Sequence, residues 1–214
     1  MCIRDRLSAT QLREQTSRRA AAGLGYNECV SYSFIDENSA KLFGGGDAST
    51  QLENPISSEM SHMRPDLFPG LLQAASRNQA RGFFNMALFE LGPVFNGGDP
   101  GNQQNNLSGV LIGQTASKDV HGQNREVDVF DVKCHIENIL SLIGAPSKFQ
   151  ILRGAESHWH PGRHGRICLG PKKTIGIFGE LHPKILSSFD IKGPTVGFTN
   201  LLDNITTPRN SNTT

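Results

Sequence analysis

The sequence predicts an α+β fold in which helices pack on a mainly antiparallel sheet. Three observations lead to this class. Two segments, near residues 68–81 and 128–143, carry aliphatic residues at helical spacing. An apolar segment over residues 86–95 contains Glu90 as its only charge, which is typical of a buried strand. The last third of the chain consists of short apolar runs joined by tight turns, a pattern that favours antiparallel strands.

Length and charge limit the class of protein. A chain of 214 residues can bury one sizeable core, or two small ones. A formal net charge of +1 provides no general field for binding nucleic acid, which argues against an autonomous DNA- or RNA-binding domain.

Localisation is predicted from two absences in the sequence. No apolar run approaches the roughly 20 residues that span a bilayer, and no signal-peptide pattern opens the chain. The cysteines lie far apart without a C-x-x-C pair, which fits the reducing cytosol. They are Cys2, Cys29, Cys134 and Cys168. We therefore expect a cytoplasmic protein with no membrane association.

The first predicted element is a helix that runs to about Ala22. Residues 1–6 show no periodicity, and we interpret them as a non-native leader. Ser8 or Thr10 can cap the helix, and two glycines follow it. Its weak stripe at i, i+4 spacing consists of Leu12, Thr16, Ala20 and Leu24.

A strand and a short helix come next. Residues 28–34 are rich in β-forming side chains. Three of these share one face: Val30, Tyr32 and Phe34. Asp36 is expected to cap a helix that ends near Phe43. Residues 44–47 form a glycine-rich loop, and no phosphate-binding pattern follows them.

The middle of the chain predicts a turn, a helix and the buried strand in close succession. Asn54 and Pro55 begin the turn, and Pro69 lies in the first turn of the helix. The apolar face of the helix consists of Phe68, Leu71, Leu72 and Ala75. Glu90 is expected to be partly buried, and a structural ion pair with an arginine explains it better than an acid/base role.

The next predicted strand, residues 107–113, lies between two polar connections. Residues 96–106 have no apolar anchor and predict a mobile loop, and residues 114–126 predict another exposed connection. The following helix has a cap at Asp128 and closes at Gly144. Its aliphatic face predicts packing on a sheet and consists of Val132, Ile136, Ile139, Leu140 and Ile143.

The C-terminal third predicts short strands. Residues 166–169 and 174–178 flank a Gly-Pro-Lys-Lys hairpin. Residues 179–183 are expected to turn into a short helix, and residues 195–202 form the last strand. The polar tail, residues 206–214, is interpreted as disordered or truncated.

Histidines form the one local cluster with metal-binding chemistry. The segment HWHPGRH contains His158, His160 and His164, but we identify no carboxylate or cysteine beside them that would complete a tetrahedral set. We therefore interpret the segment as a turn. Nucleophilic catalysis has no recognisable motif either. The residues alone thus predict no catalytic residue, no cofactor-binding residue and no metal ligand.

Residues 52–95 carry a family resemblance. The run L-x-N-P-x-S…M-R-P-x-L-x-P-G-L-L…A-L-F-E-L-G-x-V-F closely resembles the catalytic-like module of the phenylalanyl-tRNA synthetase beta subunit. The H-P-G-R of residues 160–163 matches a recurring turn segment of that family. The motif positions are Asn54, Pro55, Arg64, Pro65, Pro69, Gly70, Glu90, Gly92, His160, Pro161 and Gly162. The resemblance covers residues 7–205. It implies an antiparallel sheet flanked by helices, like that of class II aminoacyl-tRNA synthetases, in a domain that is a non-catalytic copy of their catalytic core.

The resemblance also implies that the chemistry of an active class II site is lost. Such a site holds ATP with one arginine at the end of the first strand of motif 2 and with another in a Gly-rich motif 3. A guanidinium suits this role because it can donate two parallel hydrogen bonds to phosphate oxygens. The first position corresponds to Asn96, which is neutral. The candidate third motif, residues 196–205, has one glycine and no arginine.

The helix–strand unit over residues 10–34 resembles motif 1, which class II enzymes use to pair subunits, although an ordinary αβ unit has the same pattern. The resemblance implies that this unit contacts an alpha subunit, with the stripe of small residues allowing close approach. The expected interface residues are Leu12, Thr16, Ala20 and Leu24.

The resemblance implies that this chain is a fragment of a beta subunit. It would be the structural partner of an alpha subunit in an α2β2 enzyme that attaches phenylalanine to tRNA(Phe), with the tRNA contacted indirectly. ATP and magnesium would serve the intact enzyme and no cofactor would bind this fragment. Two alternatives stay open: a free-standing RNA-binding module, and a class II-like enzyme that uses ATP through different ligands.

Overall fold

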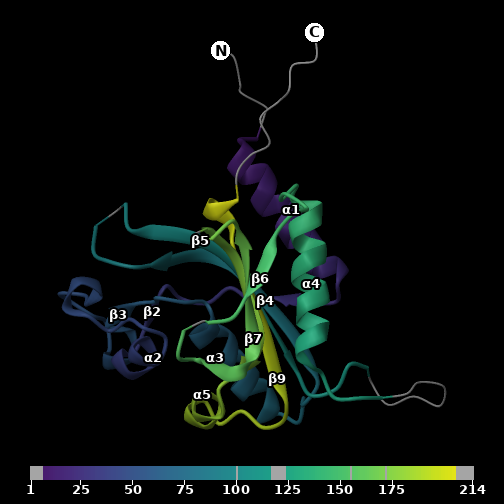
Figure 1. The fold of residues 1–214 in the computed structure, drawn as a ribbon. Coiled ribbons are helices and arrows are strands. Elements are labelled where there is room, and N and C mark those ends of the chain that lie inside the picture. The colour runs from purple at the N-terminus through teal and green to yellow at the C-terminus, as the bar shows by residue number, and fades with distance from the viewer. Residues whose placement is uncertain (1–6, 100, 117–123, 155, 172, 206–214) are drawn as a thin grey trace.

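The computed structural model describes residues 7–99, 101–116, 124–154, 156–171 and 173–205, and is built on one seven-stranded sheet (Figure 1). Across the sheet the strands are β1 (Asn27–Glu28), β4 (Met86–Phe95), β5 (Gln103–Ile112), β9 (Thr195–Leu201), β8 (Lys173–Leu181), β7 (Trp159–Leu169) and β6 (Gln150–Leu152). All neighbours are antiparallel except β1 and β4, which are parallel. The predicted α+β class is confirmed, with one parallel pair at an edge.

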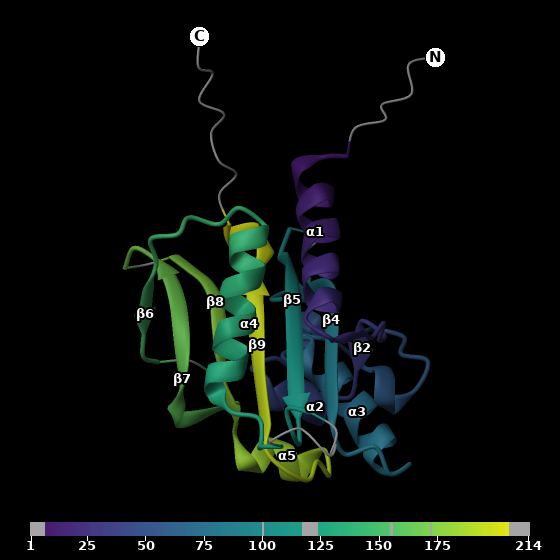
Figure 2. The same ribbon diagram turned by 90° about the vertical axis from the view of Figure 1, so that its right-hand side faces the viewer.

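Helices cover both faces of the sheet (Figure 2). One face carries α1 (Ala9–Gly23) and α4 (Val129–Leu142), and the other carries α3 (Phe68–Gln79) and α5 (Pro183–Ser188). A small antiparallel pair, β2 (Phe34–Ile35) and β3 (His62–Met63), lies near α2 (Glu37–Leu42). Three 3₁₀ turns complete the fold: η1 (Ala48–Thr50), η2 (Ser58–Met60) and η3 (Leu202–Asn204). No helix in the described ranges is long and apolar enough to cross a membrane.

Side-chain caps set the starts of the two longest helices. The Ser8 hydroxyl accepts from the Gln11 N–H at 3.2 Å, and the Gln11 side chain accepts from the Ser8 N–H at 2.9 Å. Asp128 and Asp131 form the same reciprocal pattern at the start of α4. Both capping boxes satisfy N–H groups that the helix itself leaves without partners. The predicted starts at Ser8 and Asp128 are confirmed.

Each face of the sheet has its own apolar core. Ile136 and Ile139 of α4 pack against one face, where Phe198 lies at the centre of the sheet. Leu71 and Leu72 of α3 pack against the other. Leu72 and Ile139 are both 0% exposed, so their predicted core positions are confirmed.

Helix α1 packs through a face that shares only Ala20 and Leu24 with the predicted stripe. Ala20 and Ala21 are buried in the core shared with α4, and Leu24 packs beside them. Small side chains let α1 and α4 approach closely within the chain. Leu12 is 55% exposed and Thr16 is partly buried, and their role in an interface stays a prediction.

Strand boundaries in the first third and the middle of the chain depart from the sequence prediction. Residues 28–34 do not form one strand, because the segment leaves β1 after Glu28 and re-enters a sheet only at Phe34. The predicted loop over residues 96–106 is too long, since β5 begins at Gln103 and pairs it with Phe95. Ladder hydrogen bonds come from the backbone, so polar side chains do not prevent pairing.

The predicted turn in HWHPGRH is also wrong. Residues 160–163 lie inside β7 and form a bulge. Between two matched pairs of β7 and β8 residues, β7 contains three more residues than β8 does. Those pairs are Trp159 with Leu181 and His164 with Gly179. A bulge accommodates Pro161, which cannot donate to the ladder. The predicted hairpin strands are likewise longer, with β8 continuing through Leu181. The predicted leader and tail, residues 1–6 and 206–214, lie outside the described residues.

Candidate functional site

A polar cavity of about 260 Å³ lies on the α3-side face of the sheet. Side chains from four neighbouring strands line it, among them Val94, Asn106, Thr199 and Ile177. The strand register explains why these side chains lie on the same face of the sheet. Ile177 pairs directly with Thr199, and paired residues point to the same face because side chains alternate between the two faces along each strand. The remaining walls come from segments just before α3 and around the start of β7.

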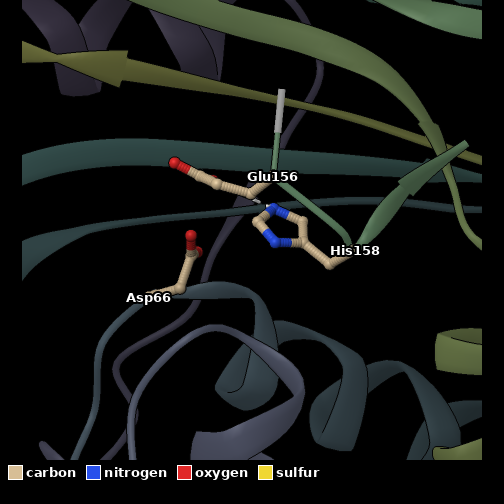
Figure 3. Close-up of side chains that lie close together, drawn as sticks. All are labelled: Asp66, Glu156 and His158. Carbon is tan, nitrogen blue, oxygen red and sulfur yellow. Dashed lines mark ion pairs between the residues drawn. The ribbon is translucent and has the colours of Figure 1, made fainter. Parts of the chain in front are cut away.

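Two carboxylates and an imidazole meet at this cavity. The side chains of Asp66, Glu156 and His158 each offer a ligand atom, and these atoms all lie within 4.8 Å of one another. Figure 3 shows the His158 ring lying beside the two carboxylates and facing the space that separates them. His158 Nε2 is 3.6 Å from a Glu156 oxygen, while an Asp66 oxygen accepts from the Phe68 N–H at 3.0 Å at the start of α3.

Burial changes the proton affinities of this group. Desolvation lowers the pKa of His158 to about 4, so the ring is neutral at pH 7. Desolvation, with added repulsion from Glu156, raises the pKa of Asp66 to about 7. The ring of His158 packs among aromatic neighbours, with its centroid 4.9 Å from that of Phe43 and 5.2 Å from that of Trp159.

Several polar atoms facing the cavity have no hydrogen-bond partner among the described residues. They include both ring nitrogens of His158, Nε1 of Trp159 and the side-chain oxygen of Asn106. Buried polar atoms in folded proteins nearly always find a partner, so this cluster distinguishes the cavity from an ordinary gap in packing.

A buried ion pair lies beside the cavity on the same face of the sheet. Arg64 Nη1 donates to Glu90 at 2.6 Å, and both side chains are 4% exposed. The Ser31 hydroxyl donates to the other Glu90 oxygen at 2.7 Å and accepts from Arg64 at 3.1 Å. Arg64 also donates to the Pro93 carbonyl at 3.0 Å. The predicted ion pair of Glu90 with an arginine is therefore present.

The network also explains two glycines of the motif. A Cβ at Gly92 would lie 2.6 Å from Arg64 Nη2, and a Cβ at Gly70 would meet the Ser31 hydroxyl. Both glycines thus leave room for the side chains that surround Glu90. Pro69 lies in the first turn of α3, as predicted.

Of the other sequence-predicted positions, Pro65 lines the cavity and several lie away from it. Asn54 and Pro55 are exposed in a bend. Within HWHPGRH, His160 accepts from the Gly162 N–H, and His164 contacts the His160 carbonyl and the Gly154 N–H. Only His158 of the three histidines reaches the cavity. Asn96 lies at its edge, after the end of β4.

Sequence reasoning missed Asp66, Glu156 and Ser31. Glu156 precedes His158 by two positions, so the view that no carboxylate lies beside the histidines is wrong. The two-residue spacing of Glu156 and His158 was the one local signal in the sequence that could have indicated this group. Asp66 and Ser31 are separated in sequence from the groups they meet, and only the fold brings them together.

Comparisons with known proteins agree on one family. A family model described as phenylalanyl tRNA synthetase beta chain CLM domain matches residues 2–199. The phenylalanine–tRNA ligase beta subunit of Ruegeria pomeroyi is 61% identical over 97% of this chain, and that of Cereibacter sphaeroides is 57% identical over 95%. The matches cover 26% and 25% of those proteins, so the chain spans about a quarter of the length of these relatives.

The fold has solved counterparts. A pyrrolysyl tRNA synthetase from Desulfitobacterium hafniense superposes with a TM-score of 0.65 and 18% identity, covering 90% of this chain and 66% of that one. At this identity the likeness concerns the fold alone, which is that of a class II synthetase catalytic core. Together with the family match over most of its length, this shows that the chain belongs to the phenylalanyl-tRNA synthetase beta chain CLM-domain family.

Proposed function

We propose that this chain is a pseudo-catalytic module of a phenylalanine–tRNA ligase beta subunit and that it acts by pairing with an alpha subunit. The intact cytoplasmic α2β2 enzyme would attach phenylalanine to tRNA(Phe) with ATP and magnesium. This module would contribute structure and would touch tRNA only indirectly. Its family and the names of its relatives support this assignment.

The charge of the cavity is the observation that carries the proposal. Its described lining includes the carboxylates of Asp66 and Glu156 and contains no arginine or lysine. Arg64 lies nearby, but its guanidinium is already engaged by Glu90 and by the Pro93 carbonyl. A polyphosphate needs cationic or N–H donors, and the described lining supplies no cationic side chain to hold ATP.

The purified chain should not form aminoacyl-adenylate. The measurement is ATP–pyrophosphate exchange with phenylalanine and magnesium, compared with a no-protein control and with the complete ligase as a positive control. Exchange above the no-protein background would contradict the pseudo-catalytic assignment and favour an enzyme that binds ATP through different ligands.

The surface for the alpha subunit is proposed to include the segment between β1 and β2. Val30 is 93% exposed and Tyr32 is 73% exposed, so two large, mainly apolar side chains are open to solvent two positions apart. Together with α3 they line a surface groove of about 910 Å³. Leu12, which is exposed, and the partly buried Thr16 are proposed as a separate contact on α1, which packs on the face of the sheet opposite α3.

Tyr32→Asp should weaken co-purification with a co-expressed cognate alpha subunit by at least about tenfold, because a charge would be buried at the contact. The side chain is exposed, so circular dichroism should be unchanged. The matched control is Ile56→Asp, since Ile56 is 94% exposed and does not line the groove. Ala20 is unsuitable for this test because it is buried inside the chain. Equal recovery of the alpha subunit with Tyr32→Asp and wild type would exclude this surface.

A further inference from the structure

The buried imidazole of His158 is the starting point. The residue is 1% exposed, and neither ring nitrogen has a hydrogen-bond partner among the described residues. Buried polar groups nearly always have a partner, because leaving them unpaired destabilises the fold. The ring is aimed at the space between Glu156 and Asp66, and its Nε2 lies 3.6 Å from the Glu156 carboxylate (Figure 3).

The two carboxylates of this group also lack a cation. The ion pairs among the described residues join neither Asp66 nor Glu156 to an arginine or a lysine. One Asp66 oxygen accepts from the Phe68 N–H, which leaves the other oxygen for a further partner. Two carboxylates and an unpaired ring nitrogen thus converge on one point without a positive charge between them.

We propose that Asp66, Glu156 and His158 bind a divalent transition-metal ion of the zinc type. Zinc takes imidazole nitrogen and carboxylate oxygen at about 2.0–2.2 Å, which places tetrahedral ligand atoms roughly 3.4 Å apart. The present atoms lie within 4.8 Å of one another, so closure requires a movement of little more than 1 Å. The Glu156 side chain is 65% exposed and free to make that movement.

The ligand set selects against hard cations. Imidazole suits zinc, cobalt and nickel, whereas magnesium and calcium prefer sites made only of oxygen. Neither ring nitrogen of His158 has a hydrogen-bond partner among the described residues, so the imidazole can offer a lone pair to an ion. Three protein ligands leave a fourth position for water from the cavity. The bound ion would join the segment before β7 to the start of α3.

Metal uptake by the 214-residue chain tests the site without an alpha subunit, so its outcome is separate from that of the proposed function. The chain is stripped with a chelator, carries no histidine tag, and has the exposed thiol removed by Cys134→Ser. Titration calorimetry with Zn²⁺ should then give one ion per chain, and the melting temperature should rise with ion concentration.

Three variants assign the ligands. Glu156→Gln and Asp66→Asn should each weaken Zn²⁺ binding by at least about tenfold, since loss of a supporting residue alone has that effect. His158→Phe should abolish uptake while keeping the aromatic packing and removing two unpaired nitrogens, so the metal-free chain should be no less stable. His160→Gln, two positions away, is the matched control and should bind normally.

The site is excluded if the parent chain takes up no Zn²⁺ at millimolar ion. It is also excluded if Glu156→Gln and Asp66→Asn bind as tightly as the parent. Should His158→Phe fail to fold, Glu156→Gln still decides, because that side chain is exposed and its replacement leaves the core unchanged.

Discussion

Arg64→Met should lower the free energy of unfolding by about 3–5 kcal/mol, because it leaves the Glu90 carboxylate buried without a counter-ion. The pair is 4% exposed on both sides and 2.6 Å apart, so solvent cannot replace the lost partner. Ser31 would still donate to Glu90, but a hydroxyl and a backbone N–H do not neutralise the charge. Denaturant melts at pH 7 provide the measurement.

Two further variants make this result specific. Arg163→Met breaks an ion pair of similar length, 2.7 Å, whose arginine is 62% exposed, and should cost at most about 1 kcal/mol. Arg64→Met combined with Glu90→Leu removes both charges and should recover part of the loss. If Arg64→Met costs no more than Arg163→Met, the buried pair does not stabilise the fold as described.

Leu72→Ala and Ile139→Ala should each cost about 2–5 kcal/mol, because both side chains are fully buried and their removal leaves a cavity. They probe the two faces of the sheet separately, one through α3 and the other through α4. Leu142→Ala is the control on α4, where Leu142 is 63% exposed, and should cost less than about 0.5 kcal/mol. A loss that small at Leu72 or Ile139 in the same denaturant melts would contradict the assigned packing.

Helices were predictable from the sequence because their signals are local. The cap at Asp128 and the aliphatic stripe through Ile139 lie within one segment, and both are present in the structure. The face used by α1 was not predictable in the same way. Its buried side is set by α4, which is more than 100 residues away in the sequence.

Strand limits were less predictable because pairing depends on the neighbouring strand. Gln103 and its polar neighbours become part of β5 only because β4 continues to Phe95. Pro161 is typical of a turn, yet the long bulge of β7 accommodates it within the sheet. In both cases side-chain chemistry alone indicated a loop.

The candidate site was predictable only in part. An arginine partner for Glu90 was expected from burial of a lone carboxylate, but Arg64 could be identified only from the fold. The group around His158 joins the start of α3 to the segment before β7, about 90 residues apart in sequence. His158 and Glu156 had a local signal in their close spacing, whereas nothing near Asp66 in the sequence indicated that it joins them.

The order of strands places the two shortest ones at the two edges of the sheet. β1 contributes two residues and β6 three, so each outermost strand offers few free N–H and C=O groups and covers only part of the longer strand inside it. Long free edges act as templates on which another chain adds a strand, and they promote aggregation. Addition of a strand to β1 or β6 would therefore form few backbone hydrogen bonds, and side chains would have to supply most of any contact made at these two strands.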